Sequence, residues 1–103
     1  MKQVVWLGNS REQIKSFPAN VRKEAGRQLM RIQSGLEPTD GPPMRTIGMG
    51  VREIRIRYEG QYRIIYVARR ESTVFVLHAF QKKTQKTAKR DIDLARQRFK
   101  DVR

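Results

Sequence analysis

Apolar and polar positions alternate in the second half of the chain, and this alternation predicts a β-sheet. Residues 51–58 alternate with a period of two, so one face of this strand is apolar and the other is charged. The apolar face carries Ile54, Ile56 and Tyr58, and the charged face carries Glu53, Arg55 and Arg57. Two further runs rich in β-branched and aromatic residues follow at 61–68 and 73–80. Because the links between the runs are short, we expect an antiparallel meander of three strands.

The first third of the chain predicts one strand and two helices. Residues 3–7 form a short run of β-branched and aromatic residues, which is typical of a strand. Ser10 has Gln13 three residues later, a spacing that suits a capping box at the start of a short helix. Pro18 then starts a second helix, whose apolar stripe recurs at helical spacing: Val21, Ala25, Leu29 and Ile32. Gly35 follows the last turn, where a helix commonly ends.

Helix-breaking residues separate these helices from the meander, and a third helix ends the chain. Residues 36–50 hold three prolines and three glycines, so we expect an ordered loop, with Gly48 and Gly50 in turns. Thr87 could cap the last helix, whose apolar stripe is Ala88, Ile92, Ala95 and Phe99. The predicted order is therefore β-α-α-β-β-β-α in a single domain over 1–103. This order predicts an α+β fold with an antiparallel sheet and helices packed on one of its faces.

Composition points to a polyanionic partner. The chain carries 23 basic residues against 10 acidic ones, a formal net charge of +13, and most of the basic residues are arginine. Arginine favours forked contacts with phosphate. The absence of cysteine excludes disulfides, thiolate nucleophiles and zinc bound by cysteine. His78 is the only histidine and has no pair of acids at ligand spacing, so we expect no metal. No apolar stretch suits a signal peptide or a membrane span, which favours a cytoplasmic protein without membrane contact.

Cations and aromatic residues are interleaved on the predicted meander and just after it. The cations lie on two neighbouring strands and in the segment after the last strand: Arg52, Arg55, Arg57, Arg63, Lys82, Lys83, Lys86 and Lys89. The aromatic residues are Tyr58, Tyr62, Tyr66 and Phe80. Cations that follow a phosphate backbone and rings on which bases stack are the components of single-stranded nucleic-acid binding. Core packing is the alternative for the rings, and we expect it for Tyr66 and Phe75.

Such a site could also cleave RNA, because RNA carries its own nucleophile, the 2′-hydroxyl. Fixed arginine and lysine donors can stabilise the negative charge that develops on the phosphate. His78 could act as an acid or a base near neutral pH. The alternative is that His78, a lone histidine in an apolar strand, is a hydrogen-bonded core residue.

Three segments carry a family resemblance: QYRIIYV at 61–67, HAFQKKTQKT at 78–87 and KRDIDLARQRF at 89–99. With the order of the elements, they resemble the RelE/ParE superfamily of bacterial toxins, and within it the phage-derived, HigB-like branch. The resemblance covers essentially the whole chain. It implies a RelE-like fold and a metal-independent endoribonuclease that needs no cofactor and cuts mRNA on the ribosome. It also implies that catalysis involves Arg55, with Arg57 as an alternative, together with Arg63 and Lys82.

The identity of the general base stays open, because RelE-type enzymes carry a tyrosine beyond the last cation and this chain has none after Tyr66. The HigB-like branch uses histidines and acids, of which His78 and Asp91 are available here. Either His78 serves as the base, or catalysis depends on electrostatic stabilisation and on ribosomal groups.

The resemblance also implies partners and leaves two alternative functions. A cognate antitoxin, with a helix-turn-helix domain of the HigA type, would neutralise the protein and could carry the complex to operator DNA. One alternative is a DNA gyrase poison of the same fold, like the ParE branch. The other is a nucleic-acid-binding protein without catalytic activity.

Overall fold

The computed structural model describes residues 1–69 and 72–102 and confirms the α+β class and the order of the elements. Four strands form one sheet: β1 (Gln3–Trp6), β2 (Val51–Arg57), β3 (Gln61–Arg69) and β4 (Thr73–Lys82). The three helices are α1 (Ser10–Lys15), α2 (Ala19–Gln33) and α3 (Lys89–Phe99). None of the helices in the described ranges is long and apolar enough to cross a membrane.

The sheet is mixed, and this corrects the prediction of an antiparallel sheet. Its strand order is β1-β4-β3-β2, in which β2, β3 and β4 form the predicted antiparallel meander and β1 runs parallel to β4. A parallel pair needs a long crossover, and here the whole chain from α1 to β3 connects the two strands. The pattern of residues 3–7 predicts a strand but does not specify its neighbour or its direction.

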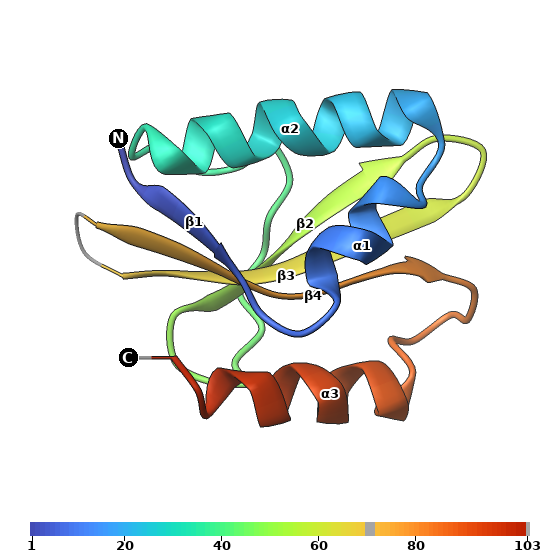
Figure 1. Cartoon of the computed structure of the whole chain (residues 1–103). Helices are drawn as coiled ribbons and strands as arrows, with labels where there is room; N and C mark the ends of the chain where they lie inside the picture. Colours follow the sequence, from blue (N-terminus) through green and yellow to red (C-terminus); the bar gives the residue numbers. More distant parts are fainter. Residues whose placement is uncertain (70–71, 103) are drawn as a thin grey trace.

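Helices cover both faces of the sheet, so the expectation that they pack on one face was wrong. In Figure 1, α2 lies above the sheet and α3 lies below it. One apolar core joins α1 and α2 to the first face through residues such as Ile54, Ile64 and Val76. A second core joins α3 to the other face through Ile65 and Leu77. The strands β3 and β4 are apolar on both faces, and burial of both faces therefore needs a helix on each side.

A β-bulge in β4 decides which side chains face α3. Ile65 of β3 pairs with His78, whereas the next residue, Tyr66, pairs with Val76, so Leu77 is an extra residue in β4. In a bulge of this kind the regular alternation is interrupted. Leu77 packs in the core under α3, and the neighbouring His78 side chain also bonds to α3. The residues after the bulge, Phe80 and Lys82, keep the face of His78.

The starts of α1 and α3 differ from the predicted ones, whereas α2 follows Pro18 as expected. Asn9 precedes α1 and makes no side-chain cap bond, while the Ser10 hydroxyl donates to the backbone oxygen of Val76 at 3.2 Å. Ser10 therefore attaches α1 to β4 instead of capping it. Ala88, not Thr87, precedes α3. Gly35 ends α2 as predicted, with a φ of 89° in the region that favours glycine.

Candidate functional site

The face of the sheet that α3 only partly covers carries a compact group of cations. The strand register sets out three rows across β2, β3 and β4: Arg57–Gln61–Lys82, Arg55–Arg63–Phe80 and Glu53–Ile65–His78. Rows lie about 7 Å apart and neighbouring strands about 4.8 Å apart. We call Arg55, Arg57, Arg63 and Lys82 the basic patch. Both Arg55 and Arg57 belong to it, because they share a face at alternate positions of β2.

A buried carboxylate holds two arginines of the basic patch together. Glu53 is 4% exposed, and its Oε1 accepts a hydrogen bond from Nε of Arg55 at 2.7 Å. The same oxygen lies 3.4 Å from Nε of Arg63. Arg55 and Arg63 stand directly opposite each other across β2 and β3, an arrangement in which like charges repel. Glu53 offsets that repulsion by its charge, and it holds the Arg55 guanidinium by a hydrogen bond.

Arg63 is buried, and burial affects the pKa of its guanidinium group. The residue is 7% exposed, and its NH2 group donates to Oε1 of Gln61 at 2.7 Å. Burial lowers the pKa of Arg63 from its ordinary value, and the charge of Glu53 opposes this shift. The hydrogen bond to Glu53 is the main cause that raises the pKa of Arg55. Both guanidinium groups stay charged at neutral pH, so the patch presents a rigid pair of cations.

Two hollows adjoin the basic patch on opposite sides. A cleft of about 490 Å³ opens where β4 extends beyond β1, between the α1–α2 junction and the start of α3. Phe80 and Lys82 line this cleft, and the Lys82 ammonium donates to the backbone oxygen of Gln85 at 2.6 Å. A second hollow of about 370 Å³ lies beside Glu53 and Arg55, next to residues 43–46. A single-stranded polyanion could therefore cross the patch with room for a base on either side.

His78 is attached to α3 and, with Asp91, forms part of the wall of the 490 Å³ cleft. Its side chain is 7% exposed, and Nε2 lies 2.7 Å from Oδ1 of Asp91 in the first turn of α3. Burial lowers the pKa of His78, and the bond to Asp91 works against that shift. A neutral ring that donates from Nε2 fits this environment. The Phe80 ring stacks on the imidazole, with ring centroids 5.0 Å apart.

Two of the residues predicted to bind RNA, Arg52 and Tyr62, lie on the opposite face of the sheet from the basic patch, although Tyr62 also lines the 490 Å³ cleft. Arg52 points to the opposite face of the sheet, where it donates to Glu37 at 2.7 Å and to the backbone oxygen of Gly41 at 2.8 Å. Tyr62 is buried on that same face and packs against Phe17, with ring centroids 4.9 Å apart. The prediction considered every cation and aromatic ring along the strands, whichever face it lies on. Because side chains alternate along a strand, the even-numbered residues of β2 and β3 lie on the α2 side and not on the side of the basic patch.

The remaining predicted residues surround the patch or belong to the core. Lys83, Lys86 and Lys89 are exposed in the segment that leads into α3, and Lys89 pairs with Asp93 at 2.9 Å. Phe80 is largely buried under α3, and its remaining surface lines the 490 Å³ cleft. Tyr66 lies in the core as expected, whereas Phe75 is only partly buried.

The comparisons with known proteins agree with the resemblance at the level of the family. The family model of the phage-derived Gp49-like proteins (DUF891) matches residues 12–100. The chain belongs to this family. It is a family of RelE-like, toxin-like proteins. A comparison with curated proteins gives no match. The matched range of the Gp49-like family contains the basic patch, Glu53 and the His78–Asp91 pair.

Sequence reasoning missed the role of Glu53 in this Gp49-like protein. A signal was present, because Glu53 is the one acid in a strand that otherwise alternates apolar and basic residues. In the parts of the chain that the structure covers, no three histidine, aspartate or glutamate side chains gather closely enough to hold a metal ion.

Proposed function

We propose that the protein is the toxin of a bacterial toxin–antitoxin pair and acts as a metal-independent endoribonuclease on ribosome-bound mRNA. The observation that carries the proposal is the Arg55–Glu53–Arg63 arrangement beside Lys82 on an open sheet face. Membership in a RelE-like family supports the toxin role. The HigB-like character, the action on ribosomes in the cytoplasm and the cognate antitoxin follow from the sequence resemblance and are part of the proposal.

The basic patch would bind the scissile phosphate and stabilise its transition state. Attack of the 2′-hydroxyl on the phosphorus adds negative charge to the non-bridging oxygens. Arg55, which Glu53 holds in place, can donate to those oxygens, and the charge of the largely buried Arg63 beside it adds to the stabilisation. Lys82 at the next row can neutralise the neighbouring phosphate or the leaving oxygen. The reaction breaks the bond to the 5′-oxygen and yields a 2′,3′-cyclic phosphate.

The sequence leaves two routes open for proton transfer: His78 as the general base, or electrostatic stabilisation with help from ribosomal groups. The geometry favours the second route. A neutral His78 that donates from Nε2 gives its one ring proton to Asp91, and only a small part of the ring is exposed in the wall of the cleft. We therefore assign His78 a positioning role for α3 and for Phe80. The proton of the 2′-hydroxyl would pass to solvent or to a ribosomal group, and the protein would contribute charge and alignment.

The test is expression of the protein in growing bacteria, with primer extension across cellular mRNA after a short induction. The wild type should arrest growth and produce new 5′ ends. Lys82→Ala removes a cation from a partly exposed site and should lower cleavage at least about a hundredfold, the usual effect of removing one such donor. Arg63→Ala should abolish cleavage, and thermal unfolding would show whether that variant is folded.

Arg52→Ala is the matched control, because it removes the same charge from the opposite face of β2. It should leave growth arrest and cleavage intact. Growth arrest with intact mRNA and loss of DNA supercoiling would contradict the proposal and assign the protein to the gyrase poisons. RNA binding without cleavage or toxicity would make it a binding protein only.

A further inference from the structure

The outer edge of β1 is an open strand edge, and the hydrogen bonds of the sheet identify its free groups. The backbone nitrogens of Gln3 and Leu7 donate to Ser72 and Val76, so odd-numbered residues of β1 face β4. The backbone groups of Val4 and Trp6 must then point away from the sheet. Lys2 also points outward, but Gln33 at the end of α2 occupies both its backbone groups. Within 1–69 and 72–102, no hydrogen bond occupies the outward groups of Val4 and Trp6.

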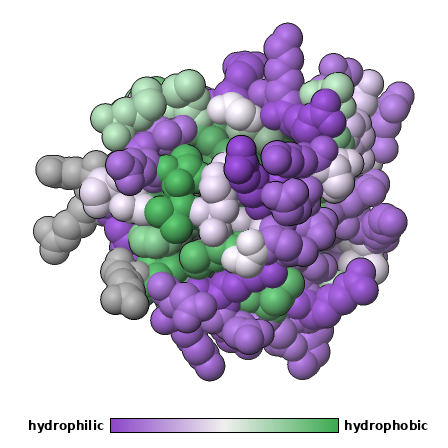
Figure 2. Space-filling view, viewed as in Figure 1, coloured by the Kyte–Doolittle hydropathy of each residue, from purple (hydrophilic) through white to green (hydrophobic). Residues whose placement is uncertain are grey.

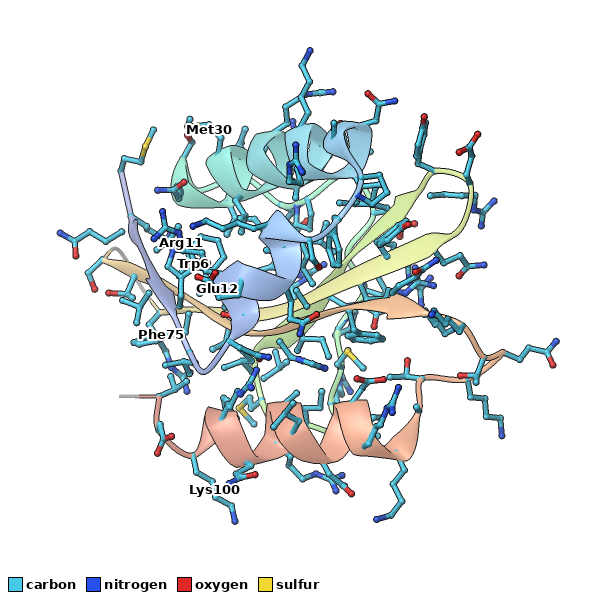
Figure 3. The ribbon with its side chains drawn as sticks, turned by 45° about the vertical axis from the view of Figure 1, so that its right-hand side comes forward. Trp6, Arg11, Glu12, Met30, Phe75 and Lys100 are labelled. Carbon is cyan, nitrogen blue, oxygen red and sulfur yellow. The ribbon has the colours of Figure 1, made fainter. Side chains whose placement is uncertain are left out.

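Apolar side chains flank this free edge on both faces of the sheet. Val4 and Trp6 lie on the α2 side and are only partly buried. Val5 is 36% exposed and pairs in register with the partly buried Phe75 on the α3 side. Figure 2 shows apolar surface gathered on the half of this face where β1 runs. In Figure 3, the labelled Trp6 and Phe75 lie on the β1 side, between Met30 of α2 and Lys100.

β1 is a short edge strand of four residues, but over residues 4–6 it carries no lysine, no proline and no bulge. Edge strands are commonly protected by lysine, proline, a bulge or a covering loop. The opposite edge follows that rule, because residues 40–44 bond to β2 along Val51, Glu53 and Arg55. The β1 sequence QVVW has no charge and no proline. An uncharged open strand with exposed apolar neighbours is suited to accept another strand.

The charge of the molecule decides which strand would fit. Two copies of this chain would bring together two net charges of +13, which opposes pairing of β1 with β1 of a second copy. In Figure 3, exposed charges of both signs are drawn on this side: Arg11 and Glu12 of α1 beside Trp6, and Lys100 farther away, just beyond the C-terminal end of α3. The net charge of +13 attracts an acidic segment and repels a basic one, and Arg11 offers a cation at the edge itself.

We propose that the outer edge of β1 binds an extended, acidic segment of a partner protein as a fifth strand of the sheet. The segment would pair with the backbone of Val4 and Trp6, set apolar side chains against Val5 and Trp6, and hold carboxylates near Arg11. This site lies on the far edge of the sheet from β2 and is separate from the basic patch. The inference does not depend on the proposed ribonuclease activity.

The probe is a short capped peptide of alternating glutamate and valine, added to the full-length protein. Binding should be measured by Trp6 fluorescence, and amide hydrogen exchange should show new protection at Val4 and Trp6. Val4→Pro removes an outward N–H while the inward bonds to β4 remain, because proline is tolerated at such edge positions. It should weaken binding about tenfold or more, the loss of roughly one hydrogen bond with added steric conflict.

Val4→Thr is the matched control and should bind the peptide like the wild type. A peptide N-methylated on its pairing edge tests the same contact without altering the protein, and it should fail to bind. Equal binding by the N-methylated peptide, or no protection at Val4 and Trp6, would overturn the proposal. Equal binding by an alternating lysine–valine peptide would overturn its acidic character. A dimer of the protein alone that Val4→Pro dissociates would assign the edge to a second copy.

Discussion

At the scale of single residues, the site depends on a carboxylate that cannot itself bind a polyanion. Glu53 is buried between two cations that stand opposite each other, and its charge makes their close approach stable. Composition and motifs predict the cations of the site, because phosphate is the expected ligand. The acid that orients them becomes visible only when the register of β2 and β3 is known.

Glu53→Gln should separate positioning from affinity. The variant loses the charge that offsets Arg55 and Arg63, so unfolding should become easier by about 3 kcal/mol, as when a buried ion pair is broken. RNA should bind at least as tightly, because a negative charge has left the patch, while the cleavage rate should fall about tenfold or more. Urea unfolding and single-turnover cleavage measure the two effects.

Glu37→Gln is the control for this change, because Glu37 forms an exposed pair with Arg52 on the other face. It should alter stability by less than about 1 kcal/mol. Equal effects of the two variants on cleavage would contradict the role assigned to Glu53.

His78 should make the stability of the protein depend on pH. Burial lowers its pKa in the folded state, so protonation favours the unfolded chain. The stability that the neutral, buried His78 ring contributes is present in full above the pKa of about 6.5 that histidine has in the unfolded chain. It is lost as the pH falls below that value toward the lower pKa of the folded state. The difference in unfolding free energy between wild type and His78→Gln should therefore shrink from pH about 7.5 to about 5. A difference that stays constant over that range would show that the ring does not titrate on unfolding.

At the scale of the elements, periodicity predicts which segments form helices and strands but not how they pair. The stripe of α2 and the alternation in β2 are local, and each appears in the structure where the sequence indicates it. The parallel pairing of β1, the location of α3 on the second face and the bulge at Leu77 depend on contacts between distant segments. The bulge has the largest consequence for the site, because it turns His78 toward Asp91.

A pair of glycines tests the packing of the elements. A Cβ on Gly48 would lie 2.3 Å from the ring of Phe99 in α3, so Gly48→Ala must displace that ring or the loop. We expect a loss of about 1–3 kcal/mol. Gly26 lies in the exposed part of α2, and none of the residues that the structure describes comes within 4 Å of an added Cβ. Gly26→Ala should therefore stabilise the protein by about 0.5–1 kcal/mol. Thermal unfolding should show shifts of opposite sign, and a rise for Gly48→Ala would contradict the packing described.

At the scale of the whole molecule, the net charge of +13 indicates a polyanion without identifying the residues that bind it. Many arginines hold the fold together by donating to backbone oxygens: Arg22, Arg31, Arg52, Arg96 and Arg98. Residue counts cannot distinguish these from Arg55 and Arg63. The strand register can, because it brings the cations of the patch to one face.

Salt dependence should reveal the difference between the two kinds of arginine. Each phosphate contact to single-stranded RNA contributes about 0.7 to the slope of log affinity against log salt concentration. Arg57→Gln should reduce the slope by about that amount. Arg31→Gln, in which the lost side chain bonds to Glu37 beside α2, should leave it unchanged. Equal slopes for both variants would mean that RNA does not bind at the patch.

The most direct test of the central claim is the chemistry of the cut ends on a ribosome-bound message treated with purified protein. If the basic patch aligns the 2′-hydroxyl with the phosphate, the downstream fragment should carry a 5′-hydroxyl and accept a kinase label without phosphatase treatment. The upstream fragment should end in a cyclic phosphate, and Arg63→Ala should produce neither fragment while Arg52→Ala produces both. A downstream 5′-phosphate, or an intact message, would contradict the account.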